Sequence, residues 1–561
     1  MKSKRLMTFL LTAMIVSTTG FVGCGGSSQE TQGSSGKADK DQHLNLALRA
    51  EPKTIDPSRA TDDYSNTVIT DTQEALTRCE NNNGKEDIKP AGAESWKTSE
   101  DGLTWTFKLR NNKWSDGQEV KAQDYEYSIK RTLSPNTASE YSYILYPIKG
   151  AKEYNKGQGK VEDVGVKALD DKTLEIKLAY PCAYFMKITY FRVFTPERKD
   201  IVEKNGEKFG SEANTLVSSG PFVIKDWIHK NKMELEKNPN YWDKDKVKLD
   251  KVTLKIIDDN QARMNETYNG SLDLAEVEKT EWIDKLSTKK DLTYITGIDP
   301  ETDYSYFNCK DKVFSNAKVR KAFALALNRE DRVKTLFPKT RKAFYAFCPP
   351  GVKIGEEDFR KKVGEEPLKK LEEEVKDPKT LLSEGLKELG MDAEPSKLTI
   401  TITASGTDAN AKQMYEKDQA NYESVLGCKI KIDYMDWAIY QDKTRKGQYQ
   451  MAAQAWVGDY NDPMTMFDLW TSTSDMNNPK WSNAQYDALI EKASKTMDQK
   501  VRFEAFKEAE KILLVDEAPI APEDYRVKTF FMKKYVKGMQ YPLFGTRQEF
   551  KYAYTEGRDT N

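Results

Sequence analysis

The first 26 residues constrain where in the sequence the folded part of this chain begins, because they carry the pattern of an export signal. The basic residues Lys2, Lys4 and Arg5 precede a mostly apolar stretch from Leu6 to Val22, and small residues follow. Several threonines and serines dilute the stretch, which barely reaches the roughly 20 apolar residues that a membrane span requires. We therefore expect the fold to begin after this segment. A retained single membrane anchor is the alternative.

Cys24 lies where a bacterial lipoprotein signal places its acylated cysteine, and the run Gly23-Cys24-Gly25-Gly26 resembles a lipobox. Phe21 departs from this pattern, which usually has leucine three positions before the cysteine. We predict that residues 1–23 are a lipoprotein signal peptide and that lipidated Cys24 holds the protein on a membrane. Residues 24–40, which are rich in glycine and serine, are predicted to form a flexible tether. A plain secretory signal is the alternative.

The length of the remaining chain requires more than one lobe. Cleavage before Cys24 removes 23 of the 561 residues and leaves 538, far more than the roughly 250–300 at which a single core stops growing. Strands are predicted from His43 onward and over 103–109, 173–178, 251–256 and 398–402, and helices over 317–333, 486–497 and 502–514. The charged residues 353–379 are expected to form a surface insertion or a helix pair. This mixture favours an α/β or α+β fold.

The charge balance excludes two classes of protein. The chain has 88 basic and 89 acidic residues and a net charge of −1, so it has no field that would gather nucleic acid. A charged content of 32% and a mean hydropathy of −0.76 exclude a polytopic membrane protein. The chain is expected to be a large, well-solvated globular protein.

Residue types that carry much of enzyme chemistry are scarce. Only two histidines are present, and His229 lies in a polar segment that predicts a hairpin turn. The five cysteines after Cys24 are isolated, so we expect buried structural thiols without metal or redox motifs. We therefore expect no catalytic residues, no metal and no cofactor, and we predict that the protein is not an enzyme.

A series of sequence motifs occurs in one order over nearly the whole chain after the tether. The motifs are EPKTIDP at 51–57, AESW at 93–96, LTWTFKLR at 103–110, KWSDG at 113–117, VKAQDY at 120–125, SGPF at 219–222, EKNPNYW at 236–242, VRKAFALALNR at 319–329 and WVGDYNDP at 456–463. In this order they resemble the oligopeptide- and dipeptide-binding family of ABC-transporter substrate-binding proteins. Most of their aromatic residues, such as Trp105, Phe107 and Trp114, are expected to pack in the core.

The resemblance implies a periplasmic-binding-protein fold, in which two α/β lobes are joined by a hinge and enclose the ligand. One lobe carries an additional subdomain. In this sequence, lobe I would comprise 41–88, 213–308 and 524–561, the extra subdomain 89–212, and lobe II 309–523.

Asp459 is the candidate ligand-binding residue that the residue pattern supports best. It follows a weakly charged run that predicts a buried strand, and a buried carboxylate requires a partner. The resemblance implies that this partner is the α-ammonium of a peptide. The alternative is that Asp459 only caps a turn.

Aromatic residues are expected to line the cleft beside Asp459. Trp456 and Trp437 match aromatic positions that line the family's cleft, Tyr460 is a further candidate, and Tyr141 or Tyr143 would add a ring from the subdomain. Core packing is the alternative for the two tryptophans.

A partner for the ligand's carboxylate is harder to find in the sequence. Family members specialised for short peptides place an arginine a few positions before the cleft tryptophan, whereas Ala453-Gln454-Ala455 precede Trp456 here. Arg445 is the nearest basic candidate. This departure leaves longer, variable or modified peptides open as ligands.

The expected function is that of an extracytoplasmic, lipid-anchored protein of the cell membrane. It would act as a monomer that delivers oligopeptides to the permease and ATPase subunits of an ABC importer. The alternatives are the same fold with a nickel chelate, heme, a sugar or a signalling peptide as ligand. A peptidase, a glycosidase and an adhesin or receptor without transport are the rivals from other classes.

Overall fold

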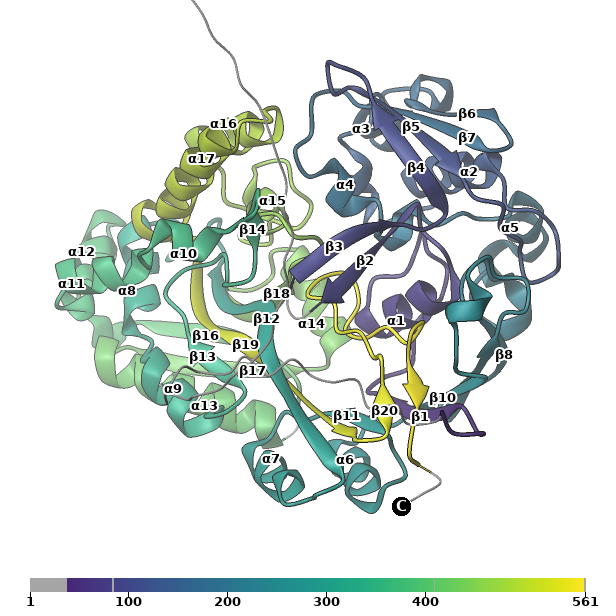
Figure 1. Cartoon of the computed structure of the whole chain (residues 1–561). Coiled ribbons are helices and arrows are strands. Elements are labelled where there is room, and N and C mark those ends of the chain that lie inside the picture. The colour runs from purple at the N-terminus through teal and green to yellow at the C-terminus, as the bar shows by residue number, and fades with distance from the viewer. Residues whose placement is uncertain (1–37, 83–84, 408, 559–561) are drawn as a thin grey trace, which may run out of the picture. The chain divides into compact units, whose positions relative to one another are not determined.

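The computed structural model describes residues 38–82, 85–407 and 409–558, and the first strand of these residues belongs to a four-stranded sheet (Figure 1). The sheet has the order β1-β10-β9-β8, with β1 parallel to β10 and the other pairs antiparallel. The strands are β1 His43–Leu48, β8 Phe222–Ile228, β9 Lys232–Lys237 and β10 Lys251–Ile256. Leu44, Leu46 and Leu48 are buried, as their alternation predicts. His229 lies in the turn between β8 and β9, which confirms the predicted hairpin.

The described part of the chain forms one compact unit that begins at Ala38. The predicted signal peptide, Cys24 and most of the predicted tether lie outside the described residues. Within the described ranges, no helix combines the length and the apolar character of a membrane span.

A second sheet of four antiparallel strands, β4-β5-β7-β6, follows the hairpin of β2 and β3. The elements of this region are β2 Thr77–Asn82, β3 Lys85–Pro90, β4 Ala93–Thr98, β5 Thr104–Leu109, α2 Ala122–Leu133, β6 Val166–Asp170 and β7 Thr173–Lys177. Helix α2 contacts β6 and β7 and buries Tyr125, Ile129 and Leu133. Phe107 and Trp114 are buried, as expected, and Trp105 is half-buried at the margin of the same core.

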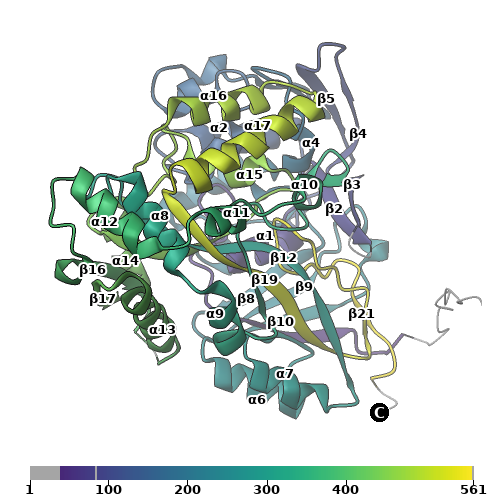
Figure 2. The same ribbon diagram turned by 90° about the vertical axis from the view of Figure 1, so that its left-hand side faces the viewer.

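A seven-stranded sheet contains the two longest strands of the described residues, β12 and β19. Its order is β11-β19-β12-β18-β16-β17, and β13 pairs with β19. The strands are β11 Leu274–Glu276, β12 Leu292–Phe307, β13 Arg341–Ala343, β16 Thr399–Ser405, β17 Lys429–Met435, β18 Met451–Val457 and β19 Ile520–Lys533. Figures 1 and 2 show β12 and β19 side by side along their length.

The two halves of β12 have different neighbours. The half that begins at Leu292 pairs with the end of β19, which also pairs with β11, whereas the half from Glu301 to Phe307 lies between β19 and β18. The β12–β19 register shifts between Ile298 and Thr302. The two strands therefore connect the part of the sheet that holds β11 with the part that holds β18.

The helix predicted over 317–333 is wrong in one respect, because the structure breaks it into α8 Ala317–Ala326 and α9 Arg329–Leu336. The Asn328 side chain accepts a hydrogen bond from the backbone N–H of Asp331 at 3.0 Å and so caps a new helix. Arg329 is buried and donates from Nε to the carbonyl oxygen of Pro522 at 2.7 Å. Periodicity does not reveal such a break, because the apolar spacing continues through it.

The remaining helices agree with the mixed pattern. Charged residues 353–379 contain α10 Phe359–Val363 and α11 Pro367–Glu374, followed by α12 Pro378–Glu388. The predicted helices near 486 and 502 are α16 Ala484–Ser494 and α17 Gln499–Lys511. The other elements are α1 Asp63–Thr72, α3 Ala151–Asn155, α4 Phe185–Ile188, α5 Lys199–Asn205, α6 Asn260–Asn269, α7 Thr280–Ser287, β14 Lys353–Ile354, β15 Glu357–Asp358, α13 Ala409–Leu426, α14 Trp437–Arg445, α15 Met464–Phe467, β20 Val536–Lys537 and β21 Tyr554–Thr555.

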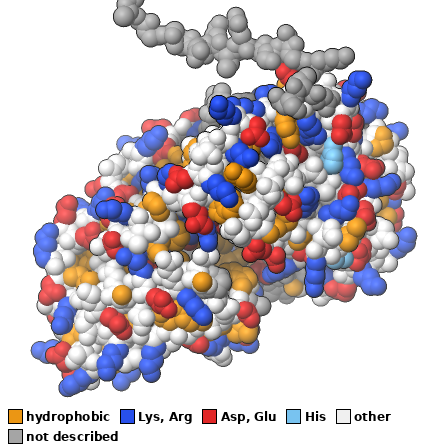
Figure 3. All heavy atoms as spheres, turned by 90° about the horizontal axis from the view of Figure 1, so that it is seen from below, with side chains coloured by type: hydrophobic (Ala, Val, Ile, Leu, Met, Phe, Trp, Pro, Cys, Tyr) orange, Lys and Arg blue, Asp and Glu red, His pale blue; other side chains and the backbone are white. Residues whose placement is uncertain are grey.

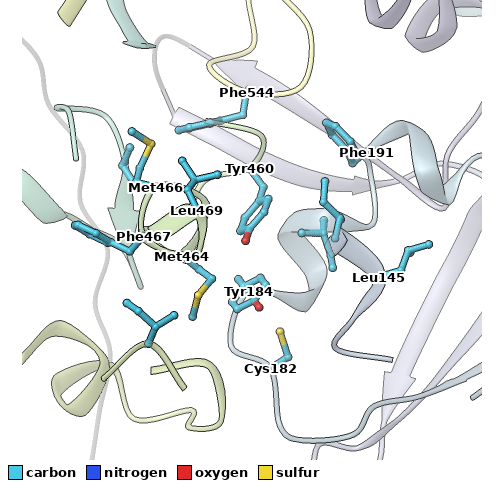
Figure 4. Packing of buried hydrophobic residues seen from close by; sticks show 14 of the residues in the cluster. Leu145, Cys182, Tyr184, Phe191, Tyr460, Met464, Met466, Phe467, Leu469 and Phe544 are labelled. Atoms are coloured by element: carbon cyan, nitrogen blue, oxygen red, sulfur yellow. The ribbon is translucent and has the colours of Figure 1, made fainter. Parts of the chain in front are cut away.

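One apolar core joins residues of the β4-to-β7 region with residues that follow β18. In Figure 4 the ring of Tyr460 faces that of Tyr184, with Met464 and Leu469 beside them. The centroids of the two tyrosine rings lie 5.2 Å apart with an interplanar angle of 12°. Segments about 275 residues apart in the chain are thus in direct contact.

Thiols and surface charges agree with the sequence predictions. Cys79, Cys182, Cys348 and Cys428 are buried and unpaired, and Cys309 is a half-buried free thiol. Basic and acidic side chains are interspersed over the face seen in Figure 3.

Candidate functional site

Asp459 lies two residues after the end of β18, in a loop that hydrogen bonds hold against neighbouring segments. The backbone N–H of Gly458 donates to the carbonyl oxygen of Pro300 at 3.1 Å, and that of Asp459 donates to Oγ1 of Thr465 at 2.9 Å. Nε1 of Trp456 donates to the carbonyl oxygen of Thr465 at 2.9 Å. These contacts fix the backbone of Asp459 and therefore the direction in which its side chain points.

Gly458 allows another segment to approach this loop closely. A Cβ atom at this position would lie 2.7 Å from Cε1 of Phe544, which comes from the C-terminal part of the chain. Any side chain here would displace that ring, so the glycine is required by packing.

Asp459 is 7% exposed, and its carboxylate accepts a hydrogen bond from Tyr143. The Tyr143 hydroxyl donates to Oδ2 at 2.5 Å. No lysine, arginine or histidine of the described residues forms an ion pair with it. Asp462, rather than Asp459, caps the following turn through the backbone N–H of Met464 at 3.0 Å. The arrangement therefore disfavours the turn-cap alternative for Asp459.

Burial controls the acidity of this carboxyl group. It raises the pKa of Asp459 from 3.8 to about 6, while the hydrogen bond from Tyr143 and the charge of Arg192 act in the opposite direction. Asp63 adds a further upward effect on the pKa. At neutral pH the group is ionised, and a cation that enters beside it would supply the missing ion-pair partner.

Asp459 lines a cavity of about 310 Å³. Tyr141 and Trp456 line the same cavity as Asp459, and their contact with a ligand stays a prediction. Its other lining residues are Thr61, Asp62, Asp63, Tyr64, Asn66, Phe191, Arg192, Asp299, Val457, Gly458, Lys528, Leu543, Gly545, Thr546 and Arg547. A volume of this size is within the range of sites for small ligands, about 300–1,000 Å³.

A second, larger cavity of about 1,140 Å³ is lined by Tyr143 and Arg445. Its wall comes from the region of residues 135–184 and from residues 445–495. The ring of Tyr143 thus belongs to the larger cavity, while its hydroxyl contacts the carboxylate of the smaller one. Nη2 of Arg445 lies 2.8 Å from Oε2 of Glu140, and this ion pair is well exposed.

Two predicted site residues are not among the lining residues of these two cavities. Tyr460 is 2% exposed and stacks on Tyr184. Trp437 is 48% exposed at the start of α14 and stacks on Tyr440, with the ring centroids 5.4 Å apart. The structure therefore brings Asp459, Trp456, Tyr141 and Tyr143 together and leaves Tyr460 and Trp437 outside. Ligand contact by these two stays a prediction.

Several charged residues of the smaller cavity were missed by the sequence interpretation. They are Asp62, Asp63, Arg192, Asp299, Lys528 and Arg547. No local pattern distinguishes them from the many other charged residues of the chain. They belong to segments that only the tertiary fold brings together. Among the described residues there is no cluster of histidine, cysteine and carboxylate side chains that could hold a metal ion.

The raised pKa of Asp459 predicts a specific pH dependence. Below about pH 6 the free protein holds a proton on Asp459, and this proton must leave before an ammonium group can pair with the carboxylate. We therefore expect affinity for an ammonium-bearing ligand to fall about tenfold for each pH unit below that value. In the ligand-free protein, the stability that Asp459 contributes is present below pH 3.8 and is lost as pH rises through about 6.

Titration calorimetry between about pH 4.5 and 7.5 measures this effect, since the range spans the shifted pKa. The variant Asp459→Asn is the control, and its affinity should not fall in this way as the pH is lowered. An affinity that stays constant as pH falls through this range in the unmodified protein would contradict the assigned role.

The fold and the sequence both resemble known proteins. Residues 87–478 match the family described as bacterial extracellular solute-binding proteins, family 5 Middle. The chain is 34% identical to the oligopeptide-binding protein OppA of Bacillus subtilis, covering 97% of this chain and 98% of that protein. It is 33% identical to the dipeptide-binding protein DppE of the same organism, over 92% of this chain and 93% of the relative.

Solved structures agree with this relationship. Listeria monocytogenes OppA bound to peptide is similar with a TM-score of 0.80 and 32% identity, covering 92% of this chain and 99% of that one. The substrate-binding domain of an oligopeptide ABC transporter from Bacillus anthracis gives a TM-score of 0.81 and 31% identity, over 93% and 100% of the two chains. The mixed α/β, two-lobe fold expected from the sequence is confirmed. The chain belongs to family 5 of the bacterial extracellular solute-binding proteins.

Proposed function

We propose that this protein binds oligopeptides with a free amino terminus and delivers them to the permease and ATPase subunits of an ABC importer. The observation that carries the proposal is the buried Asp459 carboxylate, which lines a cavity and lacks a cationic partner among the described residues. A peptide α-ammonium supplies that partner. The relatives named for oligopeptide and dipeptide binding support the same ligand class.

The two cavities suggest how a peptide is accommodated. The amino terminus would enter the smaller cavity beside Asp459, where Tyr141 and Trp456 contribute rings, and the rest of the peptide would extend past Tyr143 into the larger one. Aromatic faces and water-filled space accept many side chains, so binding would depend little on sequence. Arg445 would contact a ligand only after its exposed ion pair with Glu140 separates.

We infer that β12 and β19 act as the hinge between the lobes, because they connect both parts of the seven-stranded sheet. The proposed division keeps lobe I at 41–88, 213–308 and 524–561, the extra subdomain at 89–212 and lobe II at 309–523. Closure about such strands would couple ligand binding to recognition by the permease.

The proposed location is the extracytoplasmic face of the cell membrane, where the protein would act as a lipid-anchored monomer. Lipidation at Cys24 is expected to keep it there. In cells that express Cys24→Ser, the protein should move from the membrane fraction to the soluble extracytoplasmic fraction. Immunoblotting of the two fractions measures this shift, and a variant that stays fully membrane-bound would contradict the anchor.

The ligand class is tested by mass spectrometry of material released when the purified protein is denatured. Recovery of a mixture of peptides supports the proposal. A single non-peptide compound, such as a nickel chelate, heme or a sugar, would overturn it, and a single peptide sequence would favour the signalling-peptide alternative. Incubation with labelled peptides distinguishes a peptidase, because a binding protein returns them uncleaved.

A further inference from the structure

Arg192 is a buried cation without a carboxylate partner. The residue is 5% exposed. Its Nε donates to the carbonyl oxygen of Ala60 at 3.0 Å, whereas its Nη2 has no hydrogen-bond partner among the described residues. Apart from Arg192 and Arg263, each buried arginine of the described ranges has an ion-pair partner. An unpaired buried charge is costly, which points to a ligand that neutralises it.

Aromatic rings hold Arg192 in a fixed place relative to Asp459. The guanidinium carbon lies 4.0 Å from the ring centroid of Tyr141 and 4.5 Å from that of Phe191. The Tyr141 ring lies 5.8 Å from the ring of Tyr143, whose hydroxyl bonds to Asp459. Arg192 and Asp459 both line the cavity of about 310 Å³, so one small group can contact both.

Of the other charged residues of this cavity, Asp62 and Lys528 have no ion-pair partner among the described residues. Arg547 lies 2.9 Å from Asp63 and 3.1 Å from Asp299, and Asp62 caps α1 through Ser65. Lys528 donates to the carbonyl oxygen of Pro542 and has no ion-pair partner among the described residues.

Asp62 is half-buried, so the buried charges of this cavity that have no ion-pair partner among the described residues are one carboxylate, Asp459, and two cations, Arg192 and Lys528. A complementary ligand therefore presents one ammonium group and at least one carboxylate within a short distance.

We propose that Arg192 binds the side-chain carboxylate of an acidic first residue of the peptide, while Asp459 binds the α-ammonium of the same residue. The inference rests on the proposed function, since it assigns a preference to that same site. In aspartate or glutamate the two groups are only a few bonds apart, so a single residue in the cavity presents both. The planar guanidinium matches a carboxylate with two parallel hydrogen bonds, and Lys528 adds positive charge to the same cavity.

Pentapeptides that differ only in Glu or Gln as the first residue test this preference, since the two side chains are nearly isosteric. At about pH 7.5, calorimetry should show that the unmodified protein binds the Glu peptide at least about tenfold more tightly than the Gln peptide. In Arg192→Gln the two peptides should bind within about twofold of each other. Arg263→Gln is the matched control, because Arg263 is also buried without an ion pair but does not line this cavity, and it should keep the preference.

The outcomes separate this inference from the proposed function. Equal affinities of the Glu and Gln peptides for the unmodified protein, or an unchanged preference in Arg192→Gln, overturn the role of Arg192 while peptide binding itself stands. If neither peptide binds, the proposed function fails instead. Should Arg192→Gln not fold, Arg192→Lys decides, since a point charge without the planar fork is expected to reduce the preference.

Amidation of the peptide carboxyl terminus identifies the anion. The preference should persist in amidated peptides, because it depends on the first side chain. A loss of affinity on amidation that is absent in Arg192→Gln would assign the contact to the terminal carboxylate and overturn the proposal.

Discussion

Asp459→Ala is expected to weaken binding of a peptide with a free amino terminus by more than about 100-fold. Removing one member of a desolvated ion pair costs about 3–5 kcal/mol, because the remaining charge stays buried and unpaired. Asp459 is 7% exposed, and the neutral Tyr143 hydroxyl that contacts its carboxylate cannot supply the lost negative charge, so the ammonium of the ligand would stay buried without a counter-charge. Titration calorimetry near pH 7.5 measures the change.

N-acetylated peptide is the control for this experiment. Acetylation removes the positive charge, so the acetylated peptide should bind weakly to the unmodified protein and almost as weakly to Asp459→Ala. Equal affinity of the unmodified protein for free and acetylated peptides would exclude an ammonium contact at Asp459.

Asp462→Ala is expected to lower the free energy of unfolding by about 3–5 kcal/mol. The side chains of Asp462 and Arg502 are both 0% exposed and form a bidentate pair, with N–O distances of 2.5 and 2.9 Å. The substitution leaves the Arg502 guanidinium buried without a counter-charge. It also removes the acceptor for the backbone N–H of Met464, in the loop that carries Asp459. Urea denaturation followed by circular dichroism measures the loss.

Asp442→Ala is the matched surface control. Asp442 pairs with Lys446 one helical turn away, and both side chains are more than half exposed, at 60% and 58%. Such pairs contribute about 0.5 kcal/mol or less, so this variant should unfold almost like the unmodified protein. A similar loss of unfolding free energy in both variants would show that the buried pair contributes no more to stability than the surface pair.

The buried position of Asp459 after a strand could be predicted from the sequence because its signal is local. A charged residue directly after an apolar strand stands out against its own neighbours, and β18 is the strand that the run from Met451 predicts. Trp456 follows from the same segment. Tyr141 and Tyr143 could not be separated, because both occur in one short stretch. The fold assigns Tyr141 to the smaller cavity and Tyr143 to the hydrogen bond with Asp459.

Arg192 shows what a sequence pattern does not contain. Its ion-pair state depends on which carboxylates the fold brings near it, and that is decided by packing between segments hundreds of residues apart. Tyr143 and Asp459 illustrate the distance, since 316 positions separate them in the chain. The sequence does not reveal the exposure of Trp437 either, because an aromatic residue at the start of a helix occurs both in cleft walls and on exposed surfaces.

The sequence alone determined the strands with clear alternation, such as β1 and β10, and the family through an ordered series of motifs. These depend on neighbouring residues, whose backbone geometry and apolar spacing act over a few positions. Only the tertiary structure decided that Asn328 starts a new helix, that Tyr143 of the larger cavity donates to Asp459 of the smaller one, and that Arg192 lies in the cavity of Asp459 without an ion-pair partner. Burial and charge compensation are sums over distant segments, so they exist only once the chain has folded.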